Sequence, residues 1–195
     1  MSGMAQARCP WAGSDPLYIA YHDEEWGVPK RDPRALFEKL ILEGFQAGLA
    51  WITILRKREA FRAAFDNFDA EAMAGYGQKK VASLLKDAGI VRHRGKIEAA
   101  ISNAKVFLEL ESGPGFSQFL WAFADGKPKQ NAYGRMADIP TETPESRALA
   151  KALKARGFRF CGPTTLHAFM QSVGMVNDHL THCPRHAECG KLALT

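Results

Sequence analysis

Cysteine and histidine side chains lie near both ends of the chain, at spacings that could bind a metal ion. Cys9 and His22 lie near the N-terminus, and His179 and Cys183 are four residues apart near the C-terminus. Because positions i and i+4 share one face of a helix, an imidazole and a thiolate at that spacing could bind one ion together. Zinc favours mixed nitrogen and sulfur ligands, and four protein ligands leave no open position. We therefore expect a structural zinc ion.

Other side chains in the C-terminal segment offer the same chemistry. His182 and His186 are also four residues apart, and Cys189 follows them. Local spacing therefore does not choose the ligand set, and a Cys and His pair at this spacing also occurs without a metal. Cys161, within "FRFCGPTT", has no potential metal ligand close to it in the sequence, and the next one is His167. It is therefore predicted to be a small buried residue.

Glu43 is an acid whose position needs an explanation. On a helical projection of about 100° per residue it falls within roughly 20° of Leu36, at the border of the apolar face. A carboxylate partly in the core is costly unless it is hydrogen-bonded or paired, so Glu43 needs a partner or a function. The alternative is a surface glutamate whose stem lies along the protein and whose carboxylate reaches water.

Aromatic residues are concentrated around Glu43 in the sequence. Trp11, Tyr21, Trp26 and Trp51 all fall within the first 51 residues. Each ring alone is typical of a core residue. Together, flat rings around a carboxylate are what a nucleobase pocket requires, with stacking on the faces and a hydrogen-bond acceptor at the edge. A cationic base would also gain cation-π attraction from the rings.

A basic turn, "DAGIVRHRGKI" at residues 87–97, carries Arg92, His93, Arg94 and Lys96 between two predicted helices. The backbone N–H groups of such a turn and the positive end of the next helix dipole can bind a phosphate. A helix-hairpin-helix motif holds a DNA backbone in this way without reading its sequence. The alternative is a solvated turn whose charges confer solubility.

The elements that position these residues are predicted to be helices. Asp32 with Pro33, and Thr143 with Pro144, are typical helix starts. Apolar periodicity and following glycines predict helices over residues 34–47, 79–88, 94–112, 143–157 and 164–174. Strand patterns are scarce, and residues 126–144 are predicted to be a long loop. We expect a mainly α protein with a single domain over residues 1–195.

The net charge of +5 and a sequence pI near 9.1 suit a polyanionic partner. The sequence has neither an apolar run of membrane-spanning length nor the pattern of a secretory signal, so we expect a cytoplasmic protein without a membrane partner. Four cysteines in such a chain indicate thiols or metal ligands and not a disulfide scaffold.

Five ordered blocks of the sequence carry a family resemblance: "DPLYIAYHDEEWGVP", "LEGFQAGLAWITILRKRE", "DAGIVRHRGKI", "GFRFCGPTTLHAFMQSVG" and "VNDHLTHC". From about Cys9 to Cys183 the chain resembles the 3-methyladenine DNA glycosylase I family, the constitutive alkylation-repair enzymes of bacteria. That family belongs to the helix-hairpin-helix glycosylase superfamily. The resemblance therefore implies a mainly α helix-hairpin-helix fold with a base pocket between helical parts.

The resemblance also implies roles for particular positions of this sequence. It implies one structural zinc ion that joins the N- and C-termini, with the ligands Cys9, His22, His179 and Cys183. It implies an essential acid, two stacking rings and two further aromatic residues at or near the pocket: Glu43, Tyr21, Trp51, Trp11 and Trp26. The chain departs from the family at Ala50, where serine is common, and this change removes no pocket residue.

The activity that the resemblance implies is hydrolysis of the N-glycosidic bond of 3-methyladenine in double-stranded DNA. The base would flip out of the duplex and stack between Tyr21 and Trp51, with Glu43 accepting hydrogen bonds from the adenine edge. Free 3-methyladenine and an abasic site would be the products, without strand cleavage, because no lysine occupies an identifiable Schiff-base position. Leu49 could wedge into the gap left by the base. We expect a monomer.

Two other functions fit the same sequence features. A zinc-stabilised DNA-binding protein could sense damage without catalysis, and an assay for free base would distinguish it from an enzyme. A glycosylase of altered range could also release 3-methylguanine or another small alkylated base, and the sequence does not distinguish this range.

Overall fold

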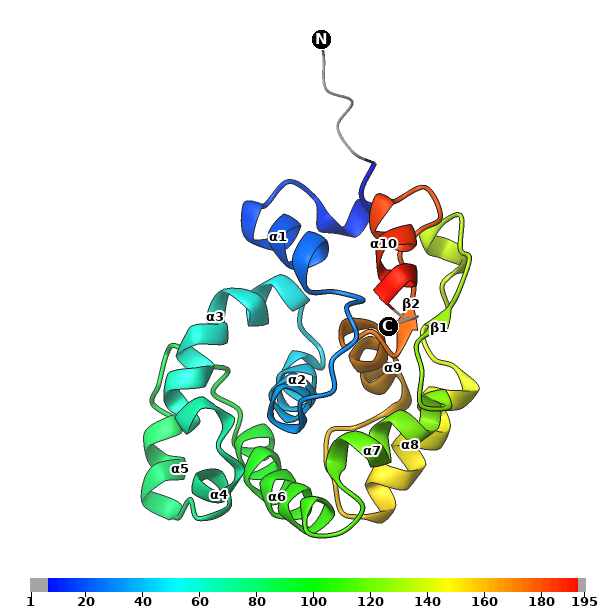
Figure 1. Cartoon of the computed structure of the whole chain (residues 1–195). Coiled ribbons are helices and arrows are strands. Elements are labelled where there is room, and N and C mark those ends of the chain that lie inside the picture. Colours follow the sequence, from blue (N-terminus) through cyan, green and yellow to red (C-terminus); the bar gives the residue numbers. More distant parts are fainter. Residues whose placement is uncertain (1–6, 193–195) are drawn as a thin grey trace.

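Helices make up most of the computed structural model, which describes residues 7–192 (Figure 1). The α-helices are α1 (Pro16–Glu24), α2 (Pro33–Gln46), α3 (Trp51–Ala64), α4 (Ala70–Ala74), α5 (Gln78–Leu84), α6 (Arg94–Glu111), α7 (Phe116–Trp121), α8 (Pro144–Ala155), α9 (Pro163–Ser172) and α10 (Pro184–Leu192). Short 3-10 turns are η1 (Pro10–Ala12), η2 (Asp66–Phe68), η3 (Ala122–Ala124) and η4 (Met136–Asp138). The prediction of a mainly α fold is confirmed.

The predicted helix starts are present. The Asp32 side chain accepts a hydrogen bond from the Ala35 N–H at 2.7 Å, and Pro33 occupies the first turn of α2. Thr143 and Ser146 form a reciprocal capping box at the start of α8. These local contacts explain why both helices begin where their sequences indicate.

The helices differ from the sequence predictions in the end of α5 and in α1, α3, α4, α7 and α10, for which no range was predicted. Helix α5 ends at Leu84, before the predicted end at residue 88, and the next residues form turns. The Ala88 carbonyl there accepts a hydrogen bond from Lys57 at 2.8 Å, a contact with α3 that local sequence does not reveal. Helix α3 itself was not predicted, and it is held by the burial of Ile54 and Phe61 against the core.

The long loop predicted over residues 126–144 contains no α-helix before Pro144, where α8 begins. It holds η4 and the two-residue strand β1 (Lys129–Gln130), which pairs in parallel with β2 (Val176–Asn177). The pair brings the segment before α10 against this loop. The small sheet therefore helps to place the C-terminal segment without changing the helical class of the fold.

Helix α2 lies at the centre of the molecule, with α3 and α5 on one side of it and α7, α8 and α9 on the other (Figure 1). Its Phe37 ring packs on Phe107, with centroids 4.7 Å apart, and its Phe45 ring packs on Phe61 at 4.7 Å. Nearly every residue from position 36 to 45 is buried. The helix is therefore covered on almost all sides, whereas its sequence suggested an apolar face with a polar border.

The N-terminal segment lies beside α10 at one end of the molecule (Figure 1). Cys9, Leu180 and Cys183 form a small buried cluster there, apart from the main core. Within residues 7–192, no helix has the length and apolar composition needed to cross a membrane. The predicted domain of 1–195 includes residues 1–6 and 193–195, which lie outside the described residues.

Candidate functional site

The four predicted metal ligands come together at one buried point. The ligand atoms of Cys9, His22, His179 and Cys183 all lie within 4.8 Å of one another. Cys9 Sγ lies 3.6 Å from His179 Nδ1, and Cys183 Sγ lies 3.6 Å from His22 Nε2. Zinc bonds of about 2.0–2.3 Å give tetrahedral edges of roughly 3.3–3.8 Å, so the two separations of 3.6 Å match edges of one tetrahedral site.

Both histidines are oriented through their second ring nitrogen. His22 Nδ1 lies 2.7 Å from an Asp23 carboxylate oxygen, and Arg8 donates hydrogen bonds to the same carboxylate. His179 Nε2 lies 3.0 Å from the Trp26 carbonyl oxygen. Such contacts fix the tautomer and the ring direction of a histidine ligand. The donor set and its anchoring both fit a bound cation.

The chain segments around the cluster decide between the alternative ligands. His182 is exposed, and His186 Nε2 lies 2.7 Å from the Asn131 carbonyl oxygen. His179 and Cys183 lie in a turn between β2 and α10, so the expected helical geometry is wrong for this pair. The turn is closed by a hydrogen bond from the Cys183 N–H to the Leu180 carbonyl at 2.8 Å, which brings both side chains inward.

A cavity of about 170 Å³ lies next to this cluster. All five predicted pocket residues line it, together with side chains from α1, α2, α9 and the η4 loop. The lining residues are Trp11, Tyr18, Tyr21, Trp26, Glu43, Gln46, Trp51, Met136, Ile139, Ala168 and Gln171. Sequence analysis missed Tyr18, Gln46, Gln171 and the η4 residues, because their approach depends on tertiary packing.

Aromatic contacts join the cavity to the metal cluster. Trp11 packs on Trp26 with ring centroids 5.0 Å apart and on the His22 ring at 5.1 Å. The Trp26 ring in turn lies 4.6 Å from the His179 ring. A metal ion at the cluster would therefore stabilise the same rings that form one wall of the cavity.

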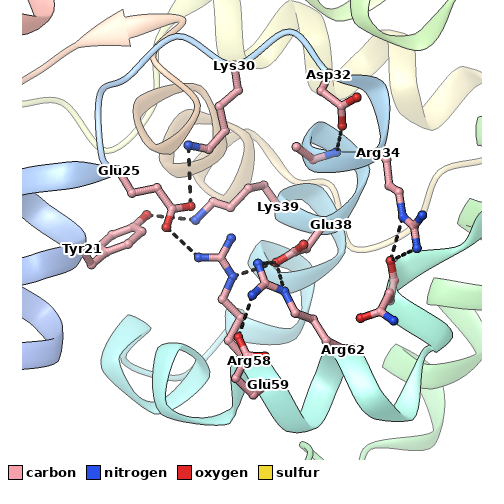
Figure 2. Close-up of polar contacts among 12 residues, drawn as sticks. Tyr21, Glu25, Lys30, Asp32, Arg34, Glu38, Lys39, Arg58, Glu59 and Arg62 are labelled. Atoms are coloured by element: carbon pink, nitrogen blue, oxygen red, sulfur yellow. Dashed lines mark hydrogen bonds and ion pairs between the residues drawn. The ribbon is translucent and has the colours of Figure 1, made fainter.

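Glu43 is buried, with 3% of its surface exposed. Burial raises its pKa above the ordinary value, and the Lys39 ammonium and the Ser172 hydroxyl oppose this shift. Lys39 Nζ lies 3.8 Å from Glu43 Oε1. It also donates a hydrogen bond to the Tyr21 hydroxyl at 2.9 Å, which Figure 2 shows. The sequence analysis did not single out Lys39, although it lies one helical turn before Glu43.

The two rings expected to stack on a base face this pair. The Tyr21 and Trp51 ring centroids are 5.5 Å apart, at an interplanar angle of 40°. Both rings line the cavity with Glu43. The arrangement offers a flat ligand two aromatic surfaces and one buried acceptor, which is the chemistry of nucleobase recognition.

Comparison with known proteins assigns the chain to a family. The methyladenine glycosylase model matches residues 11–186. The chain belongs to the methyladenine glycosylase family. It is 51% identical to DNA-3-methyladenine glycosylase 1 of Escherichia coli (strain K12) over 177 residues, covering 90% of this chain and 95% of that protein. Its identity to DNA-3-methyladenine glycosylase of Haemophilus influenzae is 50% over 178 residues, covering 91% of this chain and 96% of that protein.

Solved structures of 3-methyladenine DNA glycosylase I share the fold. One crystal structure has a TM-score of 0.90 at 54% identity, covering 91% of this chain and 98% of that chain. The Staphylococcus aureus enzyme, studied for its recognition of 3-methyladenine, has a TM-score of 0.89 at 40% identity, covering 93% of this chain and 97% of that chain. These matches confirm the family that the sequence motifs indicated.

The basic turn over residues 87–97 of this chain was expected to contact DNA, and it does connect α5 to α6. Arg92 and Arg94 are exposed there. Lys96 is buried, and its Nζ donates hydrogen bonds to the carbonyls of Phe45 at 2.9 Å and Ala47 at 2.7 Å. Lys96 thus supports the C-terminal end of α2, and its ammonium is not presented to solvent as a phosphate contact would require.

A second basic turn, which the sequence analysis did not single out, joins α8 to α9. A groove of about 720 Å³ there is lined by basic residues of α8 and of the turn, including Arg147, Lys151, Lys154 and Arg159. Phe160 in this turn has a φ of 56° and packs on His93 of the first turn, with centroids 6.1 Å apart. The two basic turns are therefore adjacent. Leu49, 40% exposed, lies in the loop between α2 and α3.

Proposed function

We propose that this chain removes 3-methyladenine from alkylated double-stranded DNA by hydrolysing its N-glycosidic bond, the first step of base-excision repair. The observation that carries the proposal is the buried Glu43 carboxylate in a cavity lined by Tyr21, Trp51, Trp11 and Trp26. Relatives about half identical to the chain are named DNA-3-methyladenine glycosylases, and a further solved structure holds 3-methyladenine. That structure has a TM-score of 0.87 at 39% identity, covering 91% of this chain and 96% of that chain.

Methylation at N3 gives adenine a positive charge within DNA and makes it a good leaving group. The enzyme therefore needs mainly to extract the base from the duplex and hold it, because the methylated base is already a good leaving group. Tyr21 and Trp51 stack on the flipped base, and Glu43 accepts hydrogen bonds from its edge while its negative charge favours the cationic form. Unmethylated adenine lacks that charge and keeps a stronger bond, so the same contacts select against it.

Hydrolysis without strand cleavage follows from the placement of the nearest amine. Lys39 is fully buried, does not line the cavity, and donates its hydrogen bond to the Tyr21 hydroxyl. A Schiff-base nucleophile has to reach the sugar carbon, and a buried amine outside the cavity lining does not. The products are therefore the free base and an intact strand with an abasic site.

The DNA backbone contacts the two basic turns. Arg92 and Arg94 of the first turn are exposed, and the α8–α9 turn carries a basic groove beside them. Leu49 enters the gap that the flipped base leaves in the stack. Phosphate contacts of this kind position the duplex, while the cavity selects the base.

Zinc is the cation that best suits two thiolates and two imidazoles, and Cys9, His22, His179 and Cys183 hold it in a closed, structural site. When bound, it supplies the charge that keeps both thiols deprotonated and joins the two ends of the chain. We also propose a monomeric cytoplasmic enzyme with one glycosylase domain over residues 1–195. The net positive charge of the chain favours binding to the polyanionic DNA backbone.

The test is a base-release assay on methylated duplex DNA, with the released bases separated and identified. We expect free 3-methyladenine, little or no 7-methylguanine, and strand breaks only after alkaline treatment of the product. Tight binding to alkylated DNA without any released base would instead indicate a damage sensor. Release of 3-methylguanine at a comparable rate would indicate a glycosylase of broader range.

A further inference from the structure

Lys39 is a fully buried lysine that the proposed function does not use. It lies on α2, and none of its surface is exposed. A buried ammonium is expensive to desolvate, and an apolar side chain of similar length usually fills such a site at lower cost. Burial lowers the pKa of Lys39, and the neighbouring Glu43 carboxylate opposes the shift. We therefore looked for a role of Lys39 in the contacts that its ammonium makes with the pocket residues.

The Lys39 ammonium contacts three groups that line the cavity. It lies 3.8 Å from the Glu43 carboxylate and donates a hydrogen bond to the Tyr21 hydroxyl at 2.9 Å. It also lies 3.8 Å from the Trp51 ring centroid and 4.8 Å from the Tyr21 ring centroid. One cation therefore touches the acid and both stacking rings from behind.

The other charged groups near this pair already have partners (Figure 2). Glu25, after α1, pairs with Arg58 of α3 at 2.6 Å and with Lys30 at 3.7 Å. Arg58 also pairs with Glu38 of α2 at 2.7 Å. Tyr18 and Tyr21 of α1 and Ser172 of α9 also interact with the Glu43 carboxylate, and the uncharged Gln46 and Gln171 line the same cavity. Lys39 is thus the cation closest to Glu43.

We propose that Lys39 is a positioning residue for base excision, whose ammonium keeps Glu43 in the carboxylate form and thereby sets the lower pH limit of the activity. The inference rests on the proposed function, since it assumes that Glu43 receives the base. A protonated carboxyl would lose one acceptor position and its attraction for a cationic base. The same ammonium also repels a cationic base, so the pair keeps the empty pocket close to neutral.

The two effects of Lys39 predict a signature that simple damage to the pocket would not give. Without the ammonium, the carboxylate form of Glu43 becomes less favourable, because desolvation is no longer opposed by a cation at 3.8 Å. At low pH, base excision should then fall. At high pH, Glu43 is ionised with or without Lys39. The variant then loses the repulsion between the ammonium and the cationic base, and this gain should offset the loss of the Lys39 contacts that position the Tyr21 and Trp51 rings.

The experiment measures kcat/KM for 3-methyladenine release between pH 5.5 and 9 in wild type, Lys39→Met and Lys39→Gln. Methionine fills the volume without charge, and glutamine keeps a donor for the Tyr21 hydroxyl without charge. We expect both variants to lose about tenfold at the acidic end and to come within about threefold of wild type at the alkaline end, as a displacement of one pKa unit implies. Lys30→Met is the matched control, because Lys30 pairs with Glu25 and does not touch the pocket; its profile should follow wild type.

A direct titration of Glu43 separates this inference from the proposed function. Carbon-13 NMR of glutamate-labelled wild type and Lys39→Met reports the carboxylate without any need for activity, and we expect the Glu43 transition at higher pH in the variant. Superimposed pH profiles or transitions, or a shift to lower pH, would overturn the role of Lys39. So would a protonated Glu43 in wild type at pH 8, a result that needs no folded variant. If wild type releases no 3-methyladenine but the NMR shift is present, the proposed function fails and the hold of Lys39 on Glu43 stands.

Discussion

Two buried polar regions lie on either side of Trp11 and Trp26. They differ in how their buried polar groups are compensated. The Cys and His cluster has four donors within 4.8 Å of one another and no opposite charge among them. The pocket instead contains its own ion pair, Glu43 with Lys39. The first arrangement could hold a metal ion, whereas the second is balanced in charge and has a cavity of about 170 Å³ beside it.

Neighbouring residues of α1 serve the two regions. Tyr21 lines the cavity and His22 points into the cluster, since successive helical residues differ by about 100° in direction. We therefore expect the cluster to stabilise the fold around the pocket and the pocket to bind the ligand. Substitutions in the two regions should therefore affect different measurements.

The largest effect should come from removing a cluster ligand. His179→Ala should abolish metal binding and lower the free energy of unfolding by on the order of 5 kcal/mol or more, because a structural ion contributes directly to folding. Metal analysis of the purified protein, with denaturant unfolding, measures both quantities. Cys161→Ser is the control, since Cys161 is a buried free cysteine outside the cluster and its loss should leave the metal content unchanged. A wild-type protein purified with almost no metal would contradict the structural ion.

Replacing a stacking ring should affect the ligand much more than the fold. Trp51→Ala should weaken binding of 3-methyladenine about 5- to 150-fold, as a stacking contribution of about 1–3 kcal/mol implies, with the metal content unchanged. Trp26→Ala should reduce both quantities, because the Trp26 ring contacts His179 and also lines the cavity. Calorimetric titration with the free base measures the affinity. Equal loss of metal in both variants would show that the two regions are not separable.

The wedge residue should matter only when the base is in a duplex. Leu49→Ala should slow release from double-stranded DNA several-fold, because the gap in the stack is left unfilled, and it should leave binding of the free base unchanged. Leu17→Ala is the matched control, since Leu17 is also an exposed leucine but lies on α1. Equal rates for Leu49→Ala and wild type on duplex substrate would remove Leu49 from the mechanism.

The smallest effects should come from single phosphate contacts. Arg94→Ala and Lys151→Ala should each weaken DNA binding a few-fold and reduce the slope of log affinity against log salt by about one. They report on the first basic turn and on the α8–α9 groove respectively. Lys105→Ala, an exposed lysine in the second half of α6, should leave the slope unchanged. A reduced slope for only one of the two variants would show which turn contacts the backbone.

Local signals were sufficient for much of the fold. Asp32 and Pro33 fixed the start of α2, and Thr143 and Pro144 fixed the start of α8, because capping depends on residues close in sequence. The family motifs identified the cluster ligands and the aromatic residues correctly as neighbours in space. The metal itself and the single domain over residues 1–195 remain predictions.

Contacts between distant segments could not be read from the sequence. Glu43 was placed at the border of an apolar face, whereas helices on several sides cover α2 and bury it with Lys39. Lys96 was assigned to DNA because it lies in a basic turn, yet its ammonium holds carbonyls at the end of α2, roughly fifty residues away. The α8–α9 groove was missed although Arg147, Lys151 and Lys154 share one face of α8, because only the folded turn brings Arg159 beside them and forms the groove.

The central claim is that the Glu43 carboxylate holds the methylated base, and Glu43→Gln tests it most directly. This change keeps the shape of the side chain and removes its charge and one of its acceptor oxygens. We predict that release of 3-methyladenine from methylated duplex falls roughly 100-fold or more, in line with the loss of one preorganised electrostatic contact, while metal content and fold are retained. Release of 3-methyladenine at the wild-type rate by a correctly folded Glu43→Gln protein would contradict the account.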